Sequence, residues 1–323
     1  MSDSVNKLAL IIPVHNEEEN IVPFYRAVKD ALTERKLKVL PADSRHFIYE
    51  FWYIDDGSTD QTLLQIKQLQ DKDTSVHFVS FSRNFGKEAA LYAGLKYTQN
   101  YGYVALMDVD LQDPPELLPV MLTKLITDRL DSVATRRSDR KGEKVLISFF
   151  SKLFYRILSQ ISSTKLVSGA RDYRVMSQQM VQAVLSLPEN QRFSKGLFAW
   201  VGFRTVYISY DNVNRQRGNS SWGFWKLVKY AITGLISFST FPLTLVVALG
   251  LITTLLALLG AIFLVVRKLL DPAVAIGGWT TMTVIIMFFG GLQMFSLGIV
   301  GRYIAAIFLE TKRRPIYIAK ESK

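Results

Sequence analysis

The sequence predicts an α/β domain with a mainly parallel sheet, followed by a hairpin of two membrane-spanning helices. Apolar segments typical of buried strands alternate with segments of helical pattern in the N-terminal part of the chain. Polar and acidic residues follow directly after several of these strands. Two long apolar stretches then occupy residues 240–266 and 278–303. The first two observations predict the sheet, and the third predicts the hairpin.

The predicted strands are continuous apolar runs, as expected where a parallel strand is covered on both faces. Residues 8–14 read Leu-Ala-Leu-Ile-Ile-Pro-Val and give the clearest example. The other expected strands are residues 51–54, 76–81 and 103–107, and the expected helices between them are residues 17–32, 61–70 and 86–97. Open parallel sheets bind ligands across the carboxyl ends of their strands. We therefore expect the functional site there.

Acidic residues gather at this predicted edge of the sheet. Asp108 and Asp110 follow an apolar strand, and residues i and i+2 of an extended chain point to the same side. Two such carboxylates suit one hard divalent cation. Asp55 and Asp56 end another strand. A solvated turn is the alternative for the first pair, and helix capping is the alternative for the second.

Each apolar stretch is long enough to cross a membrane, because about 20 helical residues span a hydrocarbon core of about 30 Å. The only charged residues between Lys229 and Arg302 are Arg267, Lys268 and Asp271, which fall in the gap between the stretches. Buried helices of a soluble core are the alternative, but such helices are shorter and keep a polar face. The sequence therefore predicts a membrane anchor.

Basic residues predict the orientation of the hairpin. Lys226 and Lys229 precede the first stretch, and basic residues 312–314 follow the second. Cytoplasmic flanks carry the excess of Lys and Arg. We therefore expect both termini on the cytoplasmic side, with a catalytic domain at residues 1–230, a tail at residues 304–323 and a short external turn between the spans.

The amino-acid composition indicates the cellular compartment and the kinds of binding partner. The chain has no Cys, which excludes disulfides and thiolate ligands and fits a reducing compartment. The formal net charge of +11 favours an anionic membrane leaflet or phosphorylated ligands. No nucleic-acid-binding motif accompanies this charge, so nucleic acid is not expected as a partner. No cleavable signal precedes the first strand.

Two further segments are expected to lie in the membrane interface. Residues 144–162 form one apolar stripe at helical spacing with basic residues on the other faces. Residues 222–238 combine Trp and Lys, which also suits an interface. A helix packed on the sheet is the alternative for the first segment. Arg136, Arg137 and Arg140 lie just before it and are expected to bind a lipid phosphate, a solvated loop being the alternative.

Several motifs occur together in this chain. They are Ile-Pro-Val-His-Asn-Glu-Glu-Glu-Asn at 12–20, Ile-Asp-Asp-Gly-Ser-Thr-Asp at 54–60, Ser-Arg-Asn-Phe-Gly-Lys at 82–87, Met-Asp-Val-Asp-Leu-Gln-Asp-Pro-Pro-Glu at 107–116 and Arg-Gln-Arg-Gly-Asn-Ser at 215–220. With them, the chain resembles the Rossmann-like GT-A glycosyltransferases of family 2. It is most similar to membrane-anchored polyprenyl-phosphate glycosyltransferases, including bactoprenol glucosyltransferases and dolichyl-phosphate mannose synthases. With the two-span tail, the resemblance covers nearly the whole chain.

The resemblance implies roles for individual residues. Those implied at the nucleotide-sugar donor are Pro13, His15, Glu17, Asp55, Asp56, Lys87 and Asp108. Those implied in catalysis near the sugar are Asp110, Gln112 and Asp113, with Asp110 or Asp113 as a weak base or an orienting group. Those assigned to the acceptor phosphate are Arg136, Arg137, Arg140 and Arg215. The implied cofactor is Mg²⁺ or Mn²⁺, held by Asp108 and Asp110 next to the donor diphosphate.

Two positions depart from the family pattern. Residues 170–176 read Ala-Arg-Asp-Tyr-Arg-Val-Met where relatives tend to carry a Thr-Gly-Asp-Phe-Arg-Leu-Met-like stretch, so Arg171 replaces a small residue. We expect the local backbone or the acceptor contacts to differ there. Ser221 and Trp222 stand where relatives often have Lys-Tyr.

The resemblance favours transfer of glucose from UDP-glucose to a polyprenyl (undecaprenyl) phosphate at the cytoplasmic face of the cell inner membrane. The acceptor oxygen is already ionised at neutral pH, since the second pKa of a phosphate monoester is about 6. A single displacement with inversion is therefore expected. A GDP-mannose donor, a modified pentose, a processive synthase and a non-catalytic membrane scaffold are the alternatives. Glycines in the second span allow close helix packing, so a homo-oligomer is also open.

Overall fold

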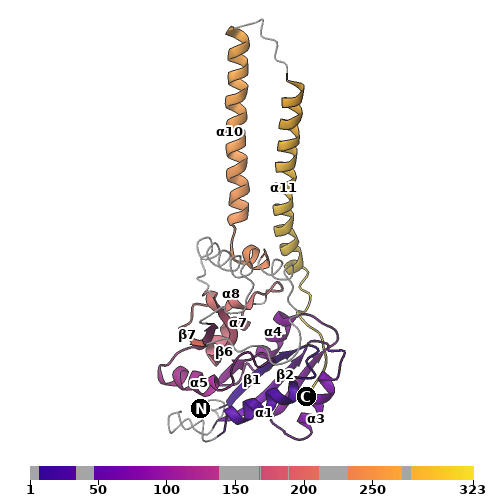
Figure 1. Cartoon of the computed structure of the whole chain (residues 1–323), viewed down its shortest axis with the longest axis vertical. Coiled ribbons are helices and arrows are strands. Elements are labelled where there is room, and N and C mark those ends of the chain that lie inside the picture. Colours follow the sequence, from indigo (N-terminus) through magenta and orange to yellow (C-terminus); the bar gives the residue numbers. More distant parts are fainter. Residues whose placement is uncertain are drawn as a thin grey trace.

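The structure, a computed structural model, describes residues 7–33, 47–137, 167, 169–187, 189–210, 232–270 and 278–323. Figure 1 shows an α/β domain from which two long helices project. Several expectations from the sequence lie outside the described residues. These are the interfacial helix at 144–162, most of the segment at 222–238, the turn at 271–277, and the side chains of Arg137, Arg140 and Arg215.

An eight-stranded sheet forms the centre of the domain. In chain order its strands are β1 (Lys7–Val14), β2 (Ile48–Asp55), β3 (Val76–Phe81), β4 (Tyr103–Leu106), β5 (Ser132–Arg137), β6 (Ala170–Ser177), β7 (Thr205–Tyr210) and β8 (Ala319–Ser322). Their spatial order is β7-β5-β6-β4-β1-β2-β3-β8. The pairs β1–β2, β1–β4, β2–β3 and β5–β7 are parallel, whereas β6 runs antiparallel between β4 and β5, and β8 runs antiparallel to β3. The predicted mainly parallel sheet is confirmed.

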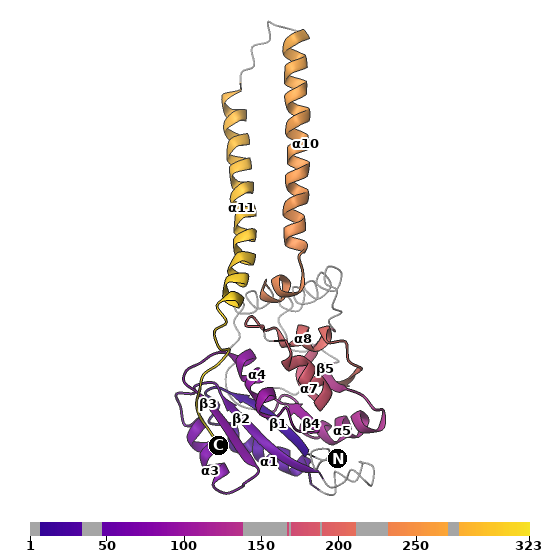
Figure 2. The same cartoon turned by 180° about the vertical axis from the view of Figure 1, so that it is seen from behind.

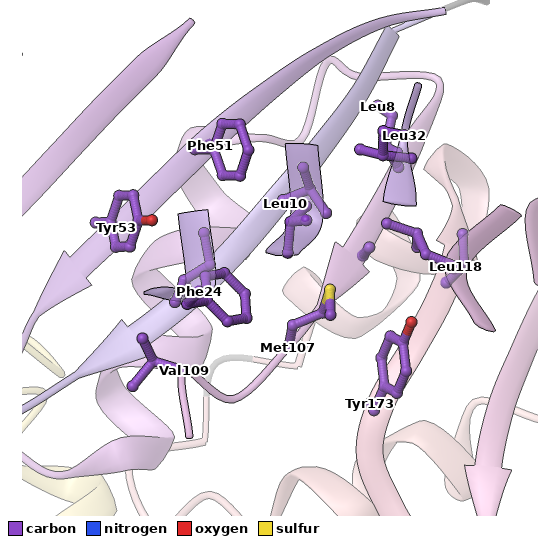
Figure 3. Packing of buried hydrophobic residues seen from close by; sticks show 14 of the residues in the cluster. Leu8, Leu10, Phe24, Leu32, Phe51, Tyr53, Met107, Val109, Leu118 and Tyr173 are labelled. Atoms are coloured by element: carbon purple, nitrogen blue, oxygen red, sulfur yellow. The ribbon is translucent and has the colours of Figure 1, made fainter. Parts of the chain in front are cut away.

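Helices cover both faces of the sheet. On one face lie α1 (Ile21–Ala31), α3 (Thr62–Gln70) and α5 (Leu117–Thr127); on the other lie α4 (Lys87–Tyr97), α7 (Gln178–Leu185) and α8 (Ser194–Trp200). Side chains of β1 alternate between the two cores, with Leu10 in the first and Ile11 in the second. Figure 3 shows Leu10, Phe24 and Met107 in the first core. Both faces are therefore buried, which explains the continuous apolar runs.

A hairpin of α10 (Phe241–Leu270) and α11 (Trp279–Thr311) follows the domain. Figures 1 and 2 show both helices projecting on the side of α8, away from the two termini. The candidate spans are Phe241–Arg267 and Met282–Thr311, with hydropathies of 2.7 and 2.0 and no buried share in either window. Exposed apolar surface on this scale is consistent with a lipid environment. The predicted hairpin is confirmed, and its second helix runs beyond the predicted end at residue 303.

After α11 the chain returns to the sheet. β8 pairs with β3, and the Ser82 N–H donates to the carbonyl of Ile318 at 3.0 Å. The Tyr317 ring stacks on Phe81, with centroids 4.8 Å apart. The last strand of the chain, Ala319–Ser322, is therefore part of the central sheet of its own chain.

The base of the hairpin contacts the segment that leads into α8. The Glu310 carboxylate accepts hydrogen bonds from the backbone N–H groups of Asn190 and Gln191. The Tyr303 hydroxyl donates to the carbonyl of Ser239 at 2.7 Å. The Phe193 ring packs on Phe238, with centroids 5.9 Å apart. The apolar helices are therefore fastened to the α/β domain by specific contacts.

Candidate active site at the carboxyl ends of the strands

Hydrogen bonds join the loop after β1 to the loop after β2. β1 and β2 run parallel, with Val14 opposite Asp55. Asn16 has φ 54°, in the left-handed region that Asn tolerates better than most residues. Its backbone N–H donates to the Ser58 hydroxyl at 3.0 Å, and its side-chain oxygen accepts from the Thr59 N–H at 2.8 Å. The conformation of the loop after β1 is thus set by the loop after β2.

Asp55 is buried, with 1% of its surface exposed. One carboxylate oxygen accepts from the Ser80 hydroxyl at 2.7 Å, and the other accepts from the Ser58 N–H at 3.0 Å. The carboxylate therefore joins the ends of β2 and β3. The role at the nucleotide-sugar donor that the resemblance implies for Asp55 stays a prediction.

Asp56 organises the loop before α4. Its two oxygens accept from the backbone N–H groups of Phe85 at 2.6 Å and Gly86 at 2.9 Å. Burial raises the pKa of Asp56, and these two bonds offset the effect only in part. The capping alternative concerned the residues that follow this pair, and the Asp60 carboxylate does accept from the Thr62 N–H in the first turn of α3, next to the N-cap residue Gln61.

The other residues implied at the nucleotide lie beside these loops. Pro13 in β1 is partly buried, whereas His15 is exposed. The Glu17 backbone N–H donates to the Thr62 hydroxyl at 2.8 Å, and its carboxylate accepts from the Asn20 amide at 2.6 Å. The structure thus brings Pro13, His15 and Glu17 to the edge where Asp55 and Asp56 lie.

Lys87, the first residue of α4, lies between two carboxylates. Its Nζ is 2.7 Å from Asp108 Oδ1 and 2.8 Å from Asp172 Oδ2. Desolvation lowers the pKa of Lys87, but the charges of Asp108 and Asp172 outweigh it and raise the pKa above its usual value. Desolvation likewise raises the pKa of Asp172, yet Lys87 and then Lys195 reverse this, so the net shift is downward. Lys87 and Asp172 are therefore both charged at neutral pH.

The residues implied in catalysis lie on the turn that follows β4. Leu111 has φ 56°, and the Gln112 N–H donates to Asp110 Oδ1 at 3.1 Å. Asp113 is 1% exposed, and its Oδ1 accepts from the Tyr210 hydroxyl and from Arg171 Nε. The structure brings Asp110, Gln112 and Asp113 together on one turn beside Asp108.

The donor set fits a divalent cation that the substrate helps to bind. Asp108 and Asp110 offer hard carboxylate oxygens after the end of β4, whereas within the described ranges no group of three or more His, Cys, Asp or Glu side chains is placed to hold a metal ion by itself. Mg²⁺ is commonly held by one or two carboxylates together with substrate phosphates and water. Lys87 shares the Asp108 carboxylate, so an ion there would lie next to a fixed positive charge.

Of the arginines assigned to the acceptor phosphate, the structure describes the side chain of Arg136. It is exposed, and its Nε donates to the Ser209 hydroxyl at 2.8 Å. In the sheet Arg136 pairs with Ala170 of β6 and Ser209 of β7. Because Ala170 and Ser209 precede Arg171 and Tyr210, Arg136 lies beside the parts of β6 and β7 that carry these two residues.

The sequence did not assign Asp172 or Tyr210 to the site. Asp172 joins it because β6 inserts antiparallel between β4 and β5, and Tyr210 joins it because β7 pairs with β5. Both pairings are non-local. For Asp172 the available signal was the family-like stretch at residues 170–176, in which Arg171 departs from the family pattern.

Comparison with known proteins assigns the family. The sequence model described as glycosyl transferase family 2 matches residues 9–185, which contain β1 to β4, the acidic turn and β6. The chain belongs to glycosyl transferase family 2. The family match agrees with the GT-A type of domain that the sequence predicted, and it covers every carboxylate of the site described above.

Relatives of this glycosyltransferase match it over nearly its whole length, hairpin included. A putative glycosyltransferase, CsbB, of Bacillus subtilis is 39% identical over 98% of this chain and 92% of its own. A bactoprenol glucosyl transferase of Shigella phage SfX is 37% identical over 98% of this chain and all of its own. One similar solved structure is glucosyl-3-phosphoglycerate synthase of Mycobacterium tuberculosis, in complex with Mn²⁺, UDP and glucosyl-3-phosphoglycerate. It is 18% identical in sequence, and the TM-score is 0.48. The match covers 72% of this chain and 79% of that one.

Proposed function

We propose that this glycosyltransferase moves a hexose, glucose from UDP-glucose, to the phosphate of a polyprenyl phosphate lipid. The observation that carries the proposal is the end-to-end similarity to proteins named bactoprenol glucosyl transferase, which extends through the apolar hairpin. Such a hairpin would hold the domain at a membrane surface, where the phosphate of a polyprenyl phosphate lies. The carboxylates at the edge of the sheet are proposed to bind the anionic diphosphate of a nucleotide sugar through a divalent cation.

In the proposed reaction, an acceptor phosphate oxygen forms a bond to the anomeric carbon as the bond from that carbon to the diphosphate breaks. The nucleophile is ionised at neutral pH, because the second pKa of a phosphate monoester is about 6. A strong base is therefore not required, and one displacement inverts the anomeric centre. The enzyme has to align the two substrates and stabilise the departing diphosphate.

Asp108 and Asp110 are proposed to hold Mg²⁺ or Mn²⁺, which would neutralise part of the diphosphate charge. Lys87 keeps the Asp108 carboxylate in place and adds a positive charge at the same point. Gln112 and Asp113 follow on the same turn and are proposed to face the sugar. Arg136 at the neighbouring strand end, with Arg137, Arg140 and Arg215, is proposed for the acceptor phosphate.

The hairpin is proposed to cross the cell inner membrane, with the catalytic domain and both termini on the cytoplasmic side. Lys and Arg flank the base of the hairpin, which supports this orientation. The described junction between Glu310 and residues 190–191 keeps the domain against the base of α11. A lipid phosphate at the membrane surface would therefore lie within reach of the domain.

The proposal is tested with the purified full-length protein in lipid nanodiscs. We expect a lipid-linked product from radiolabelled UDP-glucose, a polyprenyl phosphate and Mg²⁺ or Mn²⁺, and no product when EDTA is added. UDP-galactose, UDP-N-acetylglucosamine and GDP-mannose are compared at equal concentration. If transfer from GDP-mannose were the fastest, the donor sugar would be mannose and not glucose. No transfer from any of these donors would refute it.

A further inference from the structure

One short strand, β6, reaches both halves of the site. Its side chains alternate between the two faces of the sheet. Arg171 and Tyr173 contact the turn after β4, whereas Asp172 lies 2.8 Å from Lys87 on α4. Arg174 lies over the Phe198 ring of α8, 3.9 Å from its centroid. The position of β6 therefore fixes the acidic turn relative to the Lys87–Asp108 pair.

Arg171 makes the most specific of these contacts. Its Nε donates to Asp113 Oδ1 at 3.2 Å, and its Nη2 donates to Gln112 Oε1 at 3.2 Å. A guanidinium only donates, so it requires that the oxygen of the Gln112 amide face it. One planar group thus sets both the rotation of the Gln112 amide and the position of the Asp113 carboxylate.

Two further side chains contact the turn. Tyr210 shares Asp113 Oδ1 with Arg171, and the Tyr173 hydroxyl donates to the carbonyl of Pro114 at 3.3 Å. Asp113 is almost fully buried, and its Oδ2 has no hydrogen-bond partner among the described residues. In the described part of the chain, Arg171 is the charged group that pairs with this carboxylate.

We propose that Arg171 is a positioning residue that holds Gln112 and Asp113 against the hexose of the donor and so selects the sugar. The inference rests on the proposed function, in which the diphosphate lies at Asp108 and Asp110 and the sugar lies beside the next residues of the same turn. The Arg171 side chain is 22% exposed, so it lies at the wall of the site and not in the core.

The test separates sugar binding from nucleotide binding. The Kd values of UDP and of UDP-glucose are measured by calorimetry with Mn²⁺ for the wild-type protein in nanodiscs. The same measurement is made on Arg171→Ala, Arg171→Lys and the control Arg26→Ala, an exposed arginine on α1. We expect Arg171→Ala to keep the UDP affinity within twofold, to bind UDP-glucose at least tenfold more weakly, and to lose discrimination between UDP-glucose and UDP-galactose.

Arg171→Lys keeps a charge beside Asp113 but cannot bridge two acceptors as a planar fork does. It remains informative if Arg171→Ala does not fold. We expect Arg171→Lys to melt at the wild-type temperature while its UDP-glucose affinity and sugar discrimination still fall. Added guanidinium ion should partly restore UDP-glucose binding to Arg171→Ala.

Three outcomes would overturn the proposal. One is an Arg171→Lys protein with wild-type sugar discrimination. Another is an equal loss of UDP and UDP-glucose affinity, which would indicate a purely structural role. The third is a wild-type protein that binds no nucleotide sugar more tightly than the bare nucleotide. These binding results are independent of lipid-linked product, so a failure of the proposed transfer reaction is recognised separately.

Discussion

Glu310, near the end of α11, accepts hydrogen bonds from the backbone N–H groups of Asn190 at 2.9 Å and Gln191 at 3.0 Å. The same segment leads to Ser194, whose N–H and hydroxyl both donate to Glu88, the neighbour of Lys87 on α4. A continuous line of contacts therefore runs from the base of the second apolar helix to the Lys87–Asp108 pair.

Replacing Glu310 by Gln should loosen this line. The variant loses the charge that strengthens the backbone hydrogen bonds, and hydrogen bonds to charged groups contribute about 1.5–3 kcal/mol each. We expect faster hydrogen exchange at residues 190–194 and a lower melting temperature. Hydrogen–deuterium exchange in nanodiscs measures the first effect. Asp71→Asn, at an exposed position after α3, serves as the control and should leave exchange at residues 190–194 unchanged.

Replacing Lys87 by Met should leave Asp108 and Asp172 as neighbouring carboxylates without their shared cation. Breaking a fully buried ion pair costs about 3–5 kcal/mol. The Lys87 side chain is 33% exposed, so we expect a smaller loss of stability. Transfer activity should fall with it, because Asp108 is no longer held. Melting temperature and initial rate measure the two effects, and a variant as active as the wild type would contradict the role given to Lys87.

The pH dependence of this cluster follows from the signs of the two shifts. The lowered pKa of Asp172 adds stability that is present above its unfolded pKa of about 3.9 and is lost as the pH falls. The raised pKa of Lys87 adds stability that is present below its unfolded pKa of about 10.4 and is lost at higher pH. We therefore expect the stability difference between wild type and Lys87→Met to be flat between about pH 5 and 9. Thermal melts across this range in nanodiscs give the result, and a difference that changes steadily near neutral pH would be inconsistent.

Gly57 should not tolerate a side chain. Its φ is +65°, and an added Cβ would lie 2.5 Å from the backbone carbon of Arg83. The left-handed conformation alone costs about 1–2 kcal/mol for an L-residue, and the clash with backbone adds to this. Gly202 is the control, since its φ of +75° is similar but the nearest atom to an added Cβ, the carbonyl oxygen of Trp200, is 4.0 Å away. We expect Gly57→Ala to melt at a lower temperature than Gly202→Ala, and equal melting temperatures would argue against the close approach.

The metal ligands can be tested without turnover. Asp108→Asn and Asp110→Asn should each weaken Mn²⁺-dependent UDP binding by at least about tenfold, since changes to groups that only support metal ligands already cost about 10–100-fold. Calorimetry with and without Mn²⁺ provides the measurement. Asp71→Asn, outside the site, is expected to bind as the wild type does. If UDP binding still depended on Mn²⁺ in both aspartate variants, Asp108 and Asp110 would not be the metal ligands.

The local pattern of apolar and polar residues was sufficient to predict the strands and helices in one half of the α/β domain. The apolar runs predicted β1 to β4, and the helical spacings between them predicted α1, α3 and α4, because these elements are covered by their own sequence neighbours. The strands at Ser132–Arg137 and Thr205–Tyr210 were not predicted, since their short mixed sequences become strands only through pairing with β6 and with each other. The same limit applied to Asp172. In the sequence, Asp172 stands between Arg171 and Arg174, and a charged run of this kind is typical of a solvent-exposed surface. Only the antiparallel position of β6 brings Asp172 to Lys87.

β8 follows both apolar helices in the chain, yet it completes the sheet from which they depart. During synthesis, the ribosome must therefore make α10 and α11 before this strand can pair with β3. Until then β3 presents an open edge, the kind of edge that pairs with foreign strands. Synthesis of both helices is thus a precondition for the last hydrogen-bonded step of folding. A chain that ended before β8 would keep the edge of β3 open to strands of other proteins.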